Sequence, residues 1–147
     1  MRKQLNWKDD IKRITTLFLG KGQQKRIICV TSLSENRNQR TIVNVLVEAI
    51  EERNKKVCLI NVEEVDVSGE IVEKLEKDLC ELKEKFDYIV ICDLSISHYA
   101  EGVAIAALSD ETILIIEKGT VNGDKAIELK RELDLNGAHV LGAIFVK

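Results

Sequence analysis

The feature that most constrains the fold is a regular alternation of short apolar runs with segments of helical periodicity. Five such runs follow one another along the 147 residues, and none shows a polar residue at every second position. Continuous runs rich in Ile, Val and Leu are typical of strands buried on both faces of a parallel sheet. The predicted strands are 27–31, 57–61, 89–93, 112–116 and 140–146.

The segments before and between these strands carry apolar residues at helical spacing. Ile11, Ile14 and Phe18 predict an amphipathic helix over 8–19 that ends at Gly20. The cleanest stripe predicts a helix over 69–86, and further helices are expected at 40–53 and 124–133. The stripe consists of Ile71, Leu75, Leu79, Leu82 and Phe86. An alternating β-α order predicts an α/β fold, with helices on both faces of a five-stranded parallel sheet and right-handed crossovers.

Length and charge suggest how the chain is organised. A chain of 147 residues suits one domain, so we expect an amphipathic helix and basic arm at 1–20 and a single domain at 21–147. The first 40 residues hold ten Lys or Arg against three Asp or Glu, whereas the rest of the chain is net acidic. Such an arm can contact an anionic membrane surface or an acidic protein partner, or can simply be solvated. No nucleic-acid-binding motif is evident.

The chain shows neither a membrane-spanning run of roughly 20 apolar residues nor the apolar segment of a signal peptide. A soluble cytoplasmic protein is therefore expected. Cys29, Cys58 and Cys92 lie within predicted strands without the close spacing of metal or redox motifs, which predicts buried, unpaired core residues and no metal site. His98 and His139 lie apart from any candidate cluster, so surface or packing roles are expected for both.

The segment RIICVTSLSENRNQRT at 26–41 has the layout of a phosphate-binding strand, loop and helix start. A working P-loop reads GxxxxGK(S/T), because glycines let backbone N–H groups surround phosphates, a lysine neutralises them and a hydroxyl holds magnesium. Here Asn36, Asn38, Gln39 and Arg40 stand in the places of Gly, Gly, Lys and Ser, and Thr41 remains of the usual polar set. The loop therefore keeps its position but lacks its chemistry.

Several segments together carry a family resemblance. The chain reads VTS before the loop, VCLINVE at the second strand, KFDYIVICDLS at the third and NGAHVLGAIFVK at the end. In order and spacing, from about residue 9 onward, these segments resemble the MinD/ParA-type P-loop ATPases, and most of all the bacterial tyrosine kinase (BY-kinase) branch that works with envelope polysaccharide machinery. The resemblance implies a three-layer P-loop NTPase-like fold with sheet order 2-3-1-4-5.

The same resemblance assigns the remaining site positions. Asn61 and Glu63 match an aspartate pair that supports metal and hydroxyl activation, so one carboxylate has become an amide. Asp93 matches the third-strand carboxylate that holds magnesium through water, and Val146 stands where the family has an asparagine near the base. Seen together, these positions form an altered nucleotide site without catalytic residues or a metal. It comprises Asn36, Arg37, Asn38, Gln39, Arg40, Thr41, Asn61, Glu63 and Asp93.

Two arginines add a physical peculiarity to this loop. Cations at a helix N-terminus oppose the helix dipole by about 0.3 to 1 kcal/mol each. Arg37 and Arg40 are either relieved by a bound anion or an acidic partner, or point into solvent at little cost.

Three functional interpretations follow. The first is a non-catalytic pseudo-ATPase that binds or regulates a protein partner, in particular a membrane-associated component of polysaccharide assembly, and needs no cofactor. The second is an active ATPase or tyrosine kinase with a deviant Walker A loop, which requires ATP or ADP with magnesium. A third, minor interpretation is a receiver-like domain with Asp93 as the phosphoacceptor. A receiver would place the first strand between the second and third.

A homodimer is a further expectation from the resemblance. The family's N-terminal oligomerisation motif ExxRxxR falls at Asp9, Lys12 and Thr15, where at most the spacing is retained.

Overall fold

The parallel sheet that the sequence predicts is present in the computed structural model, which describes residues 7–20, 26–32, 39–62, 70–93, 99–117 and 123–146. Its five strands all run parallel, and each overlaps one of the predicted apolar runs. They are β1 (Ile27–Ser32), β2 (Val57–Val62), β3 (Tyr88–Asp93), β4 (Glu111–Glu117) and β5 (Val140–Val146).

The strand order is β2-β3-β1-β4-β5, as the resemblance implies. Strand β1 lies at the centre, between β3 and β4, and Thr31 of β1 is opposite Asp93 of β3. The minor receiver-like interpretation is therefore wrong, because it requires β1 between β2 and β3.

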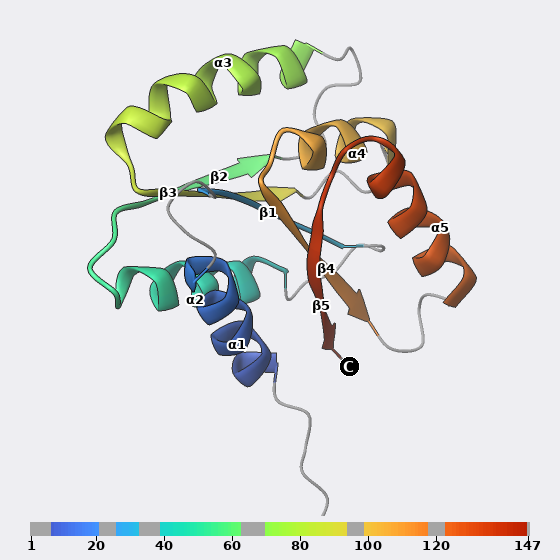
Figure 1. The fold of residues 1–147 in the computed structure, drawn as a ribbon, viewed down its shortest axis with the longest axis horizontal. Coiled ribbons are helices and arrows are strands. Elements are labelled where there is room, and N and C mark those ends of the chain that lie inside the picture. Colours follow the sequence, from blue (N-terminus) through green and yellow to red (C-terminus); the bar gives the residue numbers. More distant parts are fainter. Residues whose placement is uncertain are drawn as a thin grey trace, which may run out of the picture.

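Helices cover both faces of the sheet (Figure 1). Helices α1 (Trp7–Gly20) and α2 (Gln39–Glu51) pack against each other on one face, while α3 (Glu70–Lys85), α4 (Tyr99–Ala107) and α5 (Gly123–Leu135) cover the other. The four predicted helices are confirmed, with ends that differ by one or two residues, and α4 is a helix whose bounds the sequence pattern did not set.

Each face has its own apolar core. On the α1 and α2 face, the predicted stripe of Ile11, Ile14 and Phe18 is buried, and the ring of Phe18 meets Tyr88 edge-on at 5.6 Å between centroids. On the opposite face, Leu75 and Leu79 of α3 are buried against the central strands. Burial of one stripe per helix explains why helical periodicity in the sequence predicted these elements.

The four cysteines all lie in the described part of the chain and are free thiols. Cys29 and Cys92 are buried as predicted, because β1 and β3 are interior strands. The prediction of burial is wrong for Cys58, which is half-buried, because β2 is an edge strand and α3 covers it incompletely. Within the described residues, no helix is long and apolar enough to cross a membrane.

Candidate functional site

The candidate site lies where the carboxyl ends of β1, β2 and β3 meet the start of α2. Asp93 ends β3 between Thr31 of β1 and Val62 of β2, and Asn61 is opposite Cys92 one residue earlier. Because parallel strands end at the same edge of a sheet, residues far apart in sequence come together here. The structure gathers Gln39, Arg40, Thr41, Asn61 and Asp93 at this edge. Asn36, Arg37, Asn38 and Glu63, which the sequence also predicts for the site, lie outside the described residues.

Gln39, at the position where the resemblance implies a phosphate-binding lysine, is the first residue of α2 and is 1% exposed. Its amide nitrogen Nε2 donates one hydrogen bond to the carbonyl oxygen of Val30, at 3.1 Å, and another to that of Asp93, at 2.6 Å. A side-chain amide carries two N–H donors, so both are used within the protein. The side chain therefore joins α2 to Val30 within β1 and to Asp93, the last residue of β3.

This arrangement changes what the position can do. A lysine ammonium carries a full positive charge toward a phosphate, whereas the amide of Gln39 is neutral. Because both Nε2 hydrogens point at backbone carbonyls, the remaining polar atom of the side chain is an acceptor oxygen, which an anionic ligand does not bind. Position 39 is thus occupied by a satisfied structural group that faces the sheet.

The other described site residues differ in their exposure. Asp93 is 1% exposed, whereas the side chains of Arg40, Thr41 and Asn61 are exposed. The exposed groups present one cation, one hydroxyl and one amide at this edge of the sheet, next to a single buried carboxylate. The described part of the chain holds no cluster of three or more His, Cys, Asp or Glu residues that could hold a metal ion.

Two thiols near the site are kept protonated. Burial raises the pKa of Cys92 to about 11, the negative charge of Asp93 adds to the rise, and Arg40 and the Gln39 side chain oppose it. Burial also raises the pKa of Cys29 well above its ordinary value, helped by the charges of Asp93 and Cys92, while a hydrogen bond with Ser109 acts in the other direction. Since the thiolate is the reactive form, both cysteines are suited to packing and not to nucleophilic chemistry.

At the end of β5, Val146 is 5% exposed and belongs to the apolar core on the α1 and α2 face. The resemblance implies an asparagine contact to a base at this position, whereas the structure shows an aliphatic side chain packed inward. Such a side chain offers no hydrogen bond to a base.

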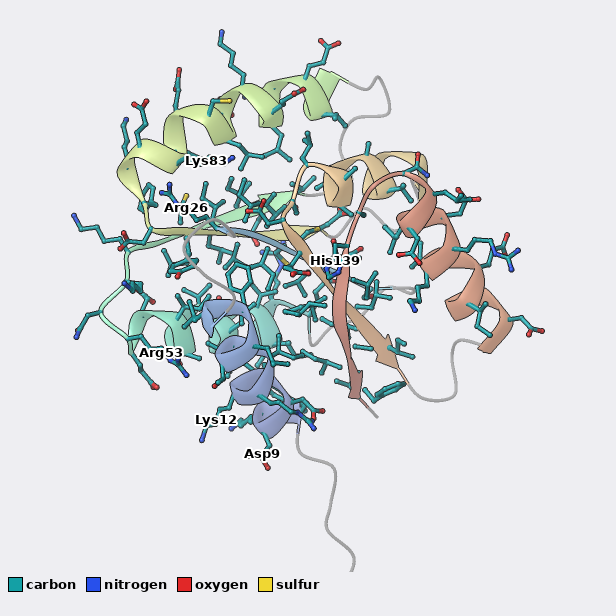
Figure 2. All side chains as sticks on the ribbon, in the orientation of Figure 1. Asp9, Lys12, Arg26, Arg53, Lys83 and His139 are labelled. Atoms are coloured by element: carbon teal, nitrogen blue, oxygen red, sulfur yellow. The ribbon has the colours of Figure 1, made fainter. Side chains whose placement is uncertain are left out.

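Sequence reasoning did not find a polar contact at the amino ends of β4 and β5. Glu111, the first residue of β4, is fully buried and contacts Nδ1 of His139, which precedes β5 and is 59% exposed (Figure 2). The expectation of a surface or packing role for His139 is confirmed. The sequence did not predict that its partner is the buried Glu111. An acidic residue shortly before the apolar run 113–116 is the signal that could have indicated it.

Comparison with known proteins adds a fold assignment. No known family profile and no curated protein matches the sequence. Among solved structures, the VpsO kinase domain is similar with a TM-score of 0.74 at 14% identity, covering 95% of each chain. The kinase domain of Escherichia coli tyrosine kinase ETK is similar with a TM-score of 0.73 at 10% identity, covering 99% of this chain and 82% of that one. The BceF tyrosine kinase domain is similar with a TM-score of 0.70 at 13% identity, covering 95% of this chain and 75% of that one.

TM-scores of 0.70 to 0.74 show a shared fold, and at 10 to 14% identity these matches show the fold alone. The resemblance to bacterial tyrosine kinase domains is therefore confirmed at the level of architecture, over nearly the whole chain.

Proposed function

We propose that this protein is a non-catalytic binding or regulatory module built on the fold of a bacterial tyrosine kinase domain. The observation that carries the proposal is the buried Gln39 amide, which donates both of its hydrogen bonds to the carbonyl oxygens of Val30 and Asp93. At the place where a nucleotide enzyme needs a cation aimed at phosphates, this chain has a neutral bridge between secondary-structure elements.

The chemistry of phosphoryl transfer supports this interpretation. Catalysis of that reaction rests almost entirely on placed positive charge and a metal ion. Among the described residues, Gln39 and Asn61 are amides where the resemblance implies a lysine and a carboxylate, and Val146 is packed in the core. Asp93 and Thr41 alone do not make a magnesium-nucleotide site.

Turnover assays test the proposal. We expect the purified protein with magnesium and ATP to release no phosphate above a protein-free blank and to incorporate no phosphate on tyrosine. Gln39→Lys should also remain inactive, because Asn36, Asn38 and Arg40 still stand at the places of two glycines and a hydroxyl. Phosphate release that disappears in Asp93→Asn and Thr41→Val would overturn the proposal, since those variants remove the two retained groups.

The second candidate is an active ATPase or tyrosine kinase with a deviant loop. It is favoured by the buried Asp93 at the end of β3, where the resemblance implies a magnesium-linked carboxylate, and by Thr41 in the first turn of α2. This candidate predicts ATP or ADP binding that depends on magnesium.

The process and partner extend the proposal by resemblance. We place the module beside a membrane-associated protein of envelope polysaccharide assembly, on the cytoplasmic side. Neighbouring genes for envelope polysaccharide enzymes would support this placement, and a cell-division or pilus cluster would contradict it.

Helix α1 bears on the alternative partner, a second copy of the chain. Asp9 and Lys12 are exposed on α1 (Figure 2), but Thr15 is 2% exposed and donates a hydrogen bond from Oγ1 to the carbonyl of Ile11 at 2.7 Å. The third position of the expected oligomerisation motif thus faces the core. We therefore favour a different protein over a homodimer formed through this motif.

A further inference from the structure

The start of α2 is fastened to the sheet from its inner side by a side chain of the helix itself. Helix N-termini carry backbone N–H groups without partners inside the helix, and a bound phosphate orders the first turn by accepting hydrogen bonds from them. In this chain, the Gln39 side chain connects the first residue of α2 to two strands from the inner side.

We propose that Gln39 is a built-in latch that keeps the first turn of α2 closed on β1 and β3 without any nucleotide. The latch joins three elements with one side chain, since Val30 lies in β1, Asp93 ends β3 and Gln39 begins α2. Val30 and Asp93 are 9 and 54 residues from Gln39 in the sequence, so the two bonds form only in the folded arrangement.

Burial makes the latch strong for a neutral side chain. Gln39 is 1% exposed, so water does not compete for the two carbonyl oxygens, and loss of the amide leaves both carbonyls without this donor in a low-dielectric site. Next to it, Ile42 and Val43 are 1% exposed and anchor the same turn through apolar packing. Polar contacts of Gln39 and apolar packing of Ile42 and Val43 therefore both fasten this turn to the rest of the protein.

The latch has a consequence for regulation. The exposed side chains of α2, including Thr41, Asn44 and Glu48, keep one arrangement whether ATP, ADP or neither is present. A protein partner that binds this surface therefore binds it equally well with or without nucleotide. This consequence rests on the proposed non-catalytic function, whereas the latch itself does not.

Hydrogen exchange of the full chain, measured by NMR or mass spectrometry, tests the latch. Gln39→Glu keeps the length of the side chain but replaces both donors by acceptors that face two carbonyls. We expect exchange of the α2 amides over residues 42–46 to accelerate by about tenfold or more, while amides over 129–133 in α5 keep their wild-type rates. Asn44→Asp makes the same amide-to-carboxylate change at an exposed position of α2, and should leave both sets of rates unchanged.

Two outcomes would overturn the latch. One is wild-type exchange over residues 42–46 in both Gln39→Glu and Gln39→Met, the second variant being an uncharged substitute that also removes both donors. The other is a wild-type protein whose α2 start becomes protected only after magnesium and ATP are added, because the first turn would then depend on a ligand. If ATP binds while Gln39→Met still loosens α2, the latch stands and the proposed non-catalytic function fails.

Discussion

At the scale of single residues, the buried thiol of Cys92 makes the stability of the fold depend on pH. Its pKa is raised to about 11 in the folded protein by burial, whereas an ordinary thiol has a value of 9.0. Between these values the unfolded chain has lost the thiol proton and the folded chain keeps it. The free energy of unfolding should therefore fall as pH rises from about 9 to about 11.

Cys92→Ala isolates this contribution, because every other titratable group is the same in both proteins. Urea unfolding across this pH range should give a shallower decline for Cys92→Ala than for the wild type. Cys80→Ala, at an exposed position of α3, should follow the wild type. Parallel curves for wild type and Cys92→Ala would show that the folded thiol is not protected from ionisation.

A second residue-scale prediction concerns the buried carboxylate of Glu111 and its partner His139. Removing the hydrogen-bond partner of a buried polar side chain costs about 1 to 3 kcal/mol, so His139→Ala should destabilise the fold. A double-mutant cycle with Glu111→Gln should give a coupling free energy of about 1 kcal/mol or more. Additive effects of the two substitutions would mean that the contact contributes no net stability.

Single residues also show which contacts cannot be predicted from sequence. The motif shows Gln39 where the resemblance implies a lysine, but the carbonyl oxygens that Gln39 binds belong to strands that only the folded sheet brings together. The Glu111–His139 contact was missed for the same reason, since the two residues are 28 apart and no sequence pattern links them. Partners of a buried polar group depend on strand order, which local patterns do not encode.

At the scale of elements, α1 is an integral part of the fold, because its apolar stripe packs into the core beside α2 and β5. Phe18 is 1% exposed, whereas the adjacent Leu17 is 49% exposed. Phe18→Ala should therefore lower the free energy of unfolding by about 3 to 5 kcal/mol, and Leu17→Ala by less than about 0.5 kcal/mol. Urea unfolding measures both. Similar small losses for the two variants would indicate that α1 packs only loosely on the domain.

Element boundaries were predictable to within one or two residues because burial follows the helical and strand periods. The contacts that hold one element against another were harder to predict from the sequence. Arg26 donates from its guanidinium to the carbonyl oxygens of Lys83, Phe86 and Asp87, and so holds the end of α3 beside the start of β1 (Figure 2). In the sequence, Arg26 is one basic residue among several that precede a strand.

At the scale of the whole molecule, the β-α alternation predicted the α/β class, but the strand order required the family resemblance. Periodicity is the same for sheets ordered 2-3-1-4-5 and 2-1-3-4-5, since both bury every interior strand on two faces. The observed order brings β3 beside β1, and this adjacency lets one side chain at the start of α2 bond both strands. The chain thus has the fold of bacterial tyrosine kinase domains, with Gln39 at the position where the resemblance implies a lysine.

Isothermal titration calorimetry with magnesium and ATP, and then with magnesium and ADP, tests this central claim most directly. Hydrogen bonds to charged groups contribute roughly 1.5 to 3 kcal/mol each, so the changes at Gln39, Asn61 and Val146 should together weaken binding by several orders of magnitude. The account predicts no heat above dilution at millimolar nucleotide. A micromolar dissociation constant that is lost in Thr41→Ala would contradict it, because the site would then bind nucleotide through its remaining hydroxyl despite the amide at position 39.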